Sequence, residues 1–86
     1  MLRVTVAKIG DVTELKVEGC IAGEAALELW AVCSRHKRAG RRLRFDMAGV
    51  RSIDPAEVIK LRRLMRQGAE AVNASLLMSA LLTDET

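Results

Sequence analysis

The sequence is poor in aromatic residues, histidine, cysteine and proline, and each shortage excludes a class of protein. Phe45 and Trp30 are the only aromatic residues among 86, so the core must be aliphatic. RNA-binding sheets stack bases on exposed aromatic rings, and this sequence offers almost none. One histidine, His36, and two cysteines provide too few ligands, at unsuitable spacing, for a zinc site. Neither a metal ion nor an organic cofactor is therefore expected.

Disulfide frameworks and long hydrophobic runs are also missing. Cys20 and Cys33 are too far apart for a CxxC motif, although a single bridge between them stays open. The apolar stretch at residues 74–82 is much shorter than the roughly 20 residues that span a membrane. Residues 1–10 alternate instead of running apolar as a signal peptide does. These features predict a soluble, cytoplasmic protein with no membrane insertion.

What the sequence does contain is a regular alternation of apolar and polar residues. Apolar side chains occupy alternate positions in residues 2–9, 13–18 and 41–47, as in strands with one buried face. Gly10 and Asp11 supply turn residues, so the first two strands form a hairpin. Strands buried on both faces would run continuously apolar, so we expect helices on only one face of the sheet.

Two segments carry apolar residues at helical spacing. In residues 23–40 they recur at i, i+3, i+4 and i+7, with glutamates early and basic residues late, as the helix dipole favours. A second helix is expected at about residues 55–67 and ends before Gly68. Residues 69–74 predict a weak fourth strand, and residues 75–82 predict a short final helix.

The predicted order is β-β-α-β-α-β-α in a single domain over residues 1–86. Strand–helix–strand units favour parallel pairing with right-handed crossovers. The expected fold class is α/β, a small open-faced mixed sheet of about four strands with helices mainly on one face.

The segment DMAGVRSIDPAE is expected to form a tight turn from the third strand into the second helix. Asp46 is placed where the strand stops, and Gly49 allows the bend. Asp54 and Pro55 suit the N-cap and the first helical position, and Glu57 stands at the capping-box position. Such a helix start is common and needs no function. However, open α/β sheets bind ligands at the carboxyl ends of strands, so this turn is also the candidate site.

The chain resembles the STAS family, the bacterial anti-sigma factor antagonists and related domains of regulators and transporters. Residues 46–50 match the Asp-Leu-Ser-Gly-Val strand end of that family, and Ile53 and Asp54 match the start of its apolar-Asp-Ser-Ser-Gly turn. The resemblance extends from about Thr5 to Leu82. It implies a STAS-like fold and a non-catalytic regulatory module that binds a protein and takes part in the regulation of transcription.

The chain departs from the family at the position that carries its chemistry. Pro55 replaces the serine that a partner kinase phosphorylates, and Ala56 and Glu57 replace the serine and glycine that follow. Without a hydroxyl group, phosphoryl transfer at these positions is impossible. Either the module has lost its switch, or the fixed charge of Glu57 imitates the phosphorylated state. A simple capping role for Glu57 is the third interpretation.

Positive charge is concentrated in one part of the chain. Residues 35–66 contain eleven basic and three acidic residues, a local balance of +8 against +3 for the whole chain. On the second helix, Ile59 falls among Arg62, Arg63 and Arg66, away from the inner stripe. An outward isoleucine ringed by arginines suits a partner with an acidic rim, although single exposed apolar residues are also ordinary.

The resemblance implies an anti-sigma factor or kinase-like regulator as the partner. The alternative is a transporter ATPase, with this chain as a small accessory subunit. The basic residues raise nucleic-acid binding as a third possibility, which the lack of exposed aromatic residues disfavours. Ser52, the only hydroxyl near the turn, is expected to face inward. The candidate partner-binding residues are Asp46, Ser52, Asp54, Pro55, Ala56, Glu57 and Ile59.

No constellation of residues indicates an enzyme, because catalysis generally needs a positioned base, nucleophile or metal. His36 lies in a basic run and is expected to be exposed. Cys33 is expected to be buried, and Cys20 has no base near it in the sequence. Asp46 and Asp54 could approach each other across the turn, yet capping and turn bonding explain both. We therefore expect no catalytic residues.

Overall fold

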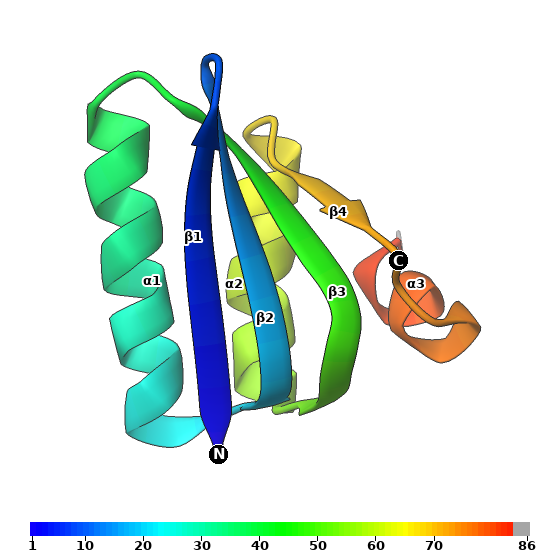
Figure 1. Cartoon of the computed structure of the whole chain (residues 1–86). Helices are drawn as coiled ribbons and strands as arrows, with labels where there is room; N and C mark the ends of the chain where they lie inside the picture. The colour runs from blue at the N-terminus through cyan, green and yellow to red at the C-terminus, as the bar shows by residue number, and fades with distance from the viewer. Residues whose placement is uncertain (84–86) are drawn as a thin grey trace.

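The computed structural model describes residues 1–83 and confirms the predicted order of elements (Figure 1). The four strands form one mixed sheet in the order β1-β2-β3-β4, in which β1 and β2 are antiparallel and the other pairs are parallel. None of the helices in this part of the chain is long and apolar enough to cross a membrane. The elements are β1 (Leu2–Ile9), β2 (Val12–Ile21), α1 (Gly23–Arg38), β3 (Arg42–Ile53), α2 (Pro55–Arg66), β4 (Glu70–Val72) and α3 (Leu76–Leu82).

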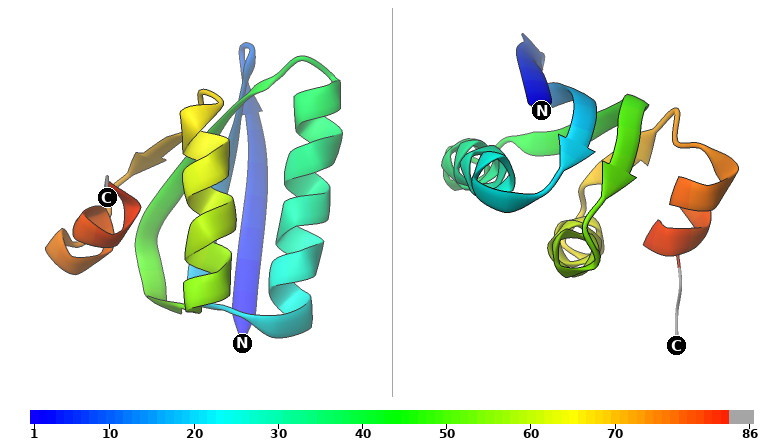
Figure 2. Two further views of the ribbon diagram at one scale, coloured as in Figure 1. Left: turned by 180° about the vertical axis from the view of Figure 1, so that it is seen from behind. Right: turned by 90° about the horizontal axis from the view of Figure 1, so that it is seen from below.

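The sheet has one covered face and one open face, as the alternation of its strands predicts. Helices α1 and α2 lie side by side against the same face (Figure 2). Leu15 and Val17 of β2 and Phe45 and Met47 of β3 are each at most 2% exposed and form the centre of the core. Leu61 of α2 is fully buried against them. The aliphatic core expected from the composition therefore lies between the sheet and the two helices.

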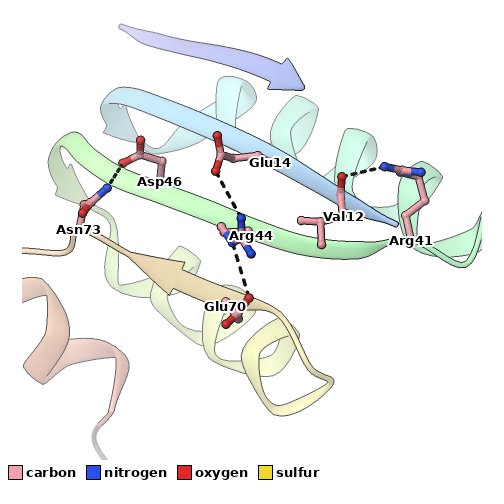
Figure 3. A network of polar contacts seen from close by, with 7 residues as sticks. All are labelled: Val12, Glu14, Arg41, Arg44, Asp46, Glu70 and Asn73. Atoms are coloured by element: carbon pink, nitrogen blue, oxygen red, sulfur yellow. Dashed lines mark hydrogen bonds and ion pairs between the residues drawn. The ribbon is translucent and has the colours of Figure 1, made fainter. Parts of the chain in front are cut away.

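The open face is polar, and its charges alternate in sign from strand to strand. Arg44 of β3 lies 3.7 Å from Glu14 of β2 and 3.6 Å from Glu70 of β4 (Figure 3). In the next position along the strands, Lys16 is the register partner of Asp46. Exposed ion pairs contribute only about 0–1 kcal/mol each, so this ladder specifies the register more than it stabilises the fold.

Strand β3 is longer than the sequence predicts. It continues to Ile53, so residues 46–53 form a strand and not a tight turn. The pairing with β2 shifts register between Lys16 and Glu18, which brings Gly49 opposite Glu18. A Cβ atom on Gly49 would lie 2.7 Å from Glu18 Cγ. Glycine therefore permits a close approach of two strands at a bulge, and the tight turn assigned to Gly49 is absent.

A polar cluster around Thr13 joins three segments at the hairpin end of the molecule. Thr13 is fully buried; its hydroxyl lies 3.0 Å from His36 Nδ1 and accepts a hydrogen bond from Arg41 Nε at 2.7 Å. Arg41 also donates to the carbonyl groups of Gly10 and Val12, the second of which is drawn in Figure 3. His36 is thus half-buried and hydrogen-bonded, and the expectation that it is exposed was wrong.

The environment of His36 favours its neutral form. Partial burial, followed by the charges of Lys8, Arg35 and Arg41, lowers the pKa of His36 from its ordinary 6.5. Because Arg41 Nε can only donate to Thr13 Oγ1, the threonine hydroxyl hydrogen is free to donate to an unprotonated Nδ1. The folded chain therefore binds fewer protons than the unfolded chain at mildly acidic pH.

We expect the free energy of unfolding to fall as the pH is lowered below 6.5 through the folded-state pKa of His36. Above pH 6.5 the ring is mostly neutral in both states. Between 6.5 and the lower folded-state pKa, the unfolded chain binds the proton more readily, so folding loses stability. Urea titrations at about pH 7, 6 and 5 measure this slope. His36→Asn keeps an acceptor near the Nδ1 position and removes the titration. Since His36 is the only histidine, an unchanged slope in the variant would contradict the assignment.

The two cysteines are free thiols, so the bridge that the sequence left open is not formed. Cys33 is 1% exposed, as predicted, and burial raises the pKa of its thiol to about 12. Cys20 is half-buried near the end of β2. The two thiols therefore differ in their access to solvent.

We expect iodoacetamide to alkylate Cys20 and spare Cys33 in the folded protein at about pH 8, because the thiolate is the reactive form. After denaturation in guanidinium chloride, both cysteines should react. Peptide mass spectrometry over a time course distinguishes the two sites. Equal rates of alkylation in the folded state would show that Cys33 is not protected by the core.

Candidate functional site

The candidate site lies where the parallel strands β2 and β3 end and the helices α1 and α2 begin. Ile21 and Ile53, the last residues of the two strands, are register partners. The Asp54 N–H donates a hydrogen bond to the Ile21 carbonyl at 3.0 Å. This bond holds the β2–α1 and β3–α2 connections together. Both strand-to-helix connections therefore lie at the same edge of the sheet (Figure 1). Open α/β sheets bind their ligands at this edge.

Asp54 and Pro55 begin α2 as the sequence predicts, but the carboxylate does not cap it. Asp54 occupies the N-cap and Pro55 the first turn, and the Asp54 carbonyl accepts hydrogen bonds from Glu57 N at 2.8 Å and Val58 N at 3.1 Å. The Asp54 side chain makes no capping hydrogen bond. Helix α1 starts after Ala22, whose methyl group has no acceptor. The edge thus presents two helix N-termini whose N–H groups no cap side chain covers.

Glu57 is buried and links the two helices. It is 9% exposed, and its Oε1 atom accepts a hydrogen bond from Trp30 Nε1 of α1 at 2.7 Å. Lys60 Nζ, one turn further along α2, lies 3.9 Å from the same oxygen. The Asp54 N–H that a capping box requires is bonded to Ile21 instead. The capping interpretation is therefore wrong, and a carboxylate buried in this way does not display a charge that would imitate a phosphate group.

The sequence contained a signal for this contact. Glu57 precedes Leu61 by four residues and Leu64 by seven, so it falls on the inner stripe of α2. Trp30 lies on the inner stripe of α1, and a buried indole N–H usually finds an acceptor. A carboxylate and a tryptophan on facing stripes indicate a hydrogen bond between the helices.

Asp46 lies within β3 and does not belong to this edge. Its carboxylate accepts hydrogen bonds at 3.1 Å from Asn73 Nδ2, which Figure 3 shows, and from the Ala48 N–H. The Asn73 bond first, then the Ala48 bond and the charge of Lys16, lower the pKa of Asp46 from 3.8. Roughly 20–25 Å of strand separates Asp46 from Asp54, so the two aspartates do not approach each other. The hydrogen bond between Asp46 and Asn73 holds the loop after β4 against the open face of the sheet.

Ser52 is exposed at the end of β3, and the expectation that it faces inward was wrong. Neighbouring residues of a strand point to opposite faces. The apolar Ile53 packs against the core, so Ser52 is left on the outside. The hydroxyl group nearest the start of α2 is therefore accessible to solvent.

Five of the predicted site residues are exposed at or near this edge of the sheet. Ile59 is 55% exposed, as expected, and the other four are also exposed. The expected ring of arginines is incomplete, because Arg62 is half-buried and its Nε donates to the Leu81 carbonyl at 2.7 Å. Lys60 and Arg63 remain exposed beside Ile59. We call this set of exposed residues the docking ledge: Ser52, Asp54, Pro55, Ala56 and Ile59.

We expect Glu57→Ala to lower the free energy of unfolding by about 1–3 kcal/mol, because the Trp30 indole N–H would lose its acceptor in a partly buried place. Glu57→Gln keeps an acceptor oxygen and should cost clearly less. Urea titration measures both changes, and the fluorescence of Trp30, the only tryptophan, reports the surroundings of the indole in the folded state. A Glu57→Ala variant with wild-type stability and an unchanged emission spectrum would disprove the link.

Comparison with known proteins assigns no family to the chain: no protein-family model matches it, and no curated protein matches it significantly. Within residues 1–83, no three or more His, Cys, Asp or Glu side chains are grouped so that they could hold a metal ion. The function is therefore inferred from the surface that β3 and the two helix N-termini form.

Proposed function

We propose that the chain is a non-catalytic, cytoplasmic regulatory module that binds a protein partner through the docking ledge. One observation carries this proposal: Pro55, Ala56 and Ile59 are exposed together at the edge of the sheet where the parallel strands end. The position that holds a phosphorylated serine in the anti-sigma factor antagonists, which the chain resembles, is held here by Pro55. The docking ledge thus includes the residue that corresponds to this serine, but that residue has no hydroxyl group.

The composition of the ledge suits a protein contact better than a reaction. Pro55 and Ala56 have no reactive group, and Ile59 is an apolar anchor of the kind that is buried at the centre of an interface. Asp54 and Lys60 lie at its margin, where charges orient a partner and set the rate of association. The N–H groups at the start of α1 and the N–H group of Ala56 in α2 have no cap side chain and offer donors to a carboxylate or carbonyl group of the partner.

The binding that we propose has no phosphorylation switch at residues 55–57. Pro55 and Ala56 carry no hydroxyl group, and the Glu57 carboxylate is held by Trp30 inside the helix layer. The ledge therefore has one state, which favours a constitutive contact over a mimic of the phosphorylated form. By resemblance to the anti-sigma factor antagonists, the proposed partner is an anti-sigma factor or a kinase-like regulator.

Ile59→Asp should weaken binding of the partner by roughly tenfold or more, because a charge replaces the apolar anchor. Leu76→Asp is the matched control: Leu76 is 93% exposed on α3, outside the ledge. The two variants and the wild type serve as baits in the native host lysate, and mass spectrometry identifies proteins that only Ile59→Asp fails to retain. A histidine-kinase-like protein or anti-sigma factor supports the proposal, whereas a transporter ATPase would assign the chain to that complex. A set of bound proteins that is indifferent to Ile59→Asp would rule out the ledge.

Incubation of the chain with the recovered kinase and ATP tests the absence of the switch. We expect intact-mass spectrometry to show no added phosphate, because residues 54–57 contain no hydroxyl group. Ser52 is the accessible hydroxyl of the ledge, and Ser52→Ala serves as its control. A phosphate that appears on the wild type and disappears with Ser52→Ala would replace the constitutive contact by a switch at a new position.

A further inference from the structure

Strand β1 has a long backbone edge that no other strand of the described chain uses. It is eight residues long and lies at the end of the sheet, paired only with β2 over its whole length. It contains no proline and no bulge, two of the devices that blunt such an edge. Its charged residues, Arg3 and Lys8, stand near its ends. An edge of this kind is a template for one more strand.

Helix α1 extends past this edge when the sheet is viewed face-on (Figure 1). Between the helix and the strand runs a groove of about 220 Å³. Val6, on the same side of β1, is 42% exposed. A strand added to β1 would lay its alternate side chains over this groove and cover apolar surface that is now open to water. The groove is lined by Leu2, Val4, Ala25, Glu28, Leu29 and Val32.

We propose that β1 of a second copy of this chain occupies the edge, so that two sheets join across a two-fold axis. The sequence of β1 suits antiparallel pairing with itself. With Thr5 at the axis, Arg3 comes opposite Ala7 of the second copy, and Leu2 comes opposite Lys8 of the second copy. No two like charges face each other in this register, which cross-strand pairing requires.

The same register gives charge complementarity inside the groove. Lys8 points to the helix side of the sheet, since it is spaced at even intervals from the groove residues Leu2 and Val4, and its charge reaches His36 of α1. In the dimer, Lys8 of one copy comes opposite Leu2 of the other, which lines the same groove as Glu28, so we expect Lys8 and Glu28 to pair. The contact between Lys8 and Glu28 forms twice, because the interface is two-fold. Val6 of one copy covers Val4 of the other.

Sedimentation equilibrium between about 5 and 200 µM at neutral pH should give the mass of two chains. Lys8→Glu and Glu28→Lys should each weaken the dimer by roughly tenfold or more, and the double variant should restore it, because the two charges are exchanged across the interface. Arg38→Glu reverses a charge on α1 outside the groove and should leave the mass unchanged. Circular dichroism confirms that each variant is folded.

A mass of one chain at the highest concentration would overturn the proposal and leave the edge to a strand of another protein. So would a dimer that is indifferent to both charge reversals. Hydrogen exchange gives a second readout: amide hydrogens of residues 2–9 should exchange more slowly at high protein concentration, and those of Glu70–Val72 should not change. Ile59→Asp should leave the dimer intact, so the failure of this interface and the failure of the docking ledge are distinguishable.

Discussion

The parallel pairing of β2 with β3 is the constraint on which the rest of the structure depends. The two strands stay paired to their last residues, Ile21 and Ile53, although the register shifts twice along the way. Because the pairing runs so far, both helices start at one edge, and the Asp54 N–H closes on the Ile21 carbonyl. If β3 ended at Asp46, α2 would start roughly 20–25 Å further back along the sheet, and the docking ledge would not form.

The helix layer adds a second constraint, because it places a carboxylate where water is largely excluded. Burying Glu57 is costly unless its oxygens are bonded, and the Trp30 indole and the Lys60 ammonium group provide those partners. The link joins α1 to α2 on the buried side of the α2 turn whose outer side carries Ala56 and Ile59. Its functional consequence is that the Glu57 carboxylate, two residues after Pro55, is bonded within the helix layer and is not presented to a partner. What the ledge offers a partner is therefore shape, an apolar anchor and backbone N–H groups, with no modified side chain.

The periodicity of apolar residues predicted the features that depend on local sequence. It was wrong for the features that depend on contacts between residues far apart in the chain. The element order, the polar open face, the buried Cys33 and the exposed Ile59 all follow from alternation or helical spacing. The end of β3 does not, because Gly49 and Ser52 favour turns locally and only pairing with β2 across a bulge keeps them in a strand. The burial of His36 likewise depends on Thr13, 23 residues away in the chain. Glu57 and Trp30 lie on the inner stripes of their helices, which indicates a hydrogen bond between them. The sequence alone does not show that these two helices are neighbours. The resemblance to STAS domains stays a prediction.

The two proposed surfaces are compatible because they use different edges of the sheet. The ledge lies at the ends of β2 and β3, whereas self-association uses the lateral edge of β1 (Figure 2). A two-fold dimer through β1 leaves both ledges exposed and fixes the separation between them. Phosphorylation would not regulate a module of this kind. A rigid pair of ledges would nevertheless bind a two-fold partner more tightly than a single ledge, because the second contact becomes intramolecular. Dimeric partners would then be retained in preference to monomeric ones, and this selection needs no hydroxyl group at residue 55.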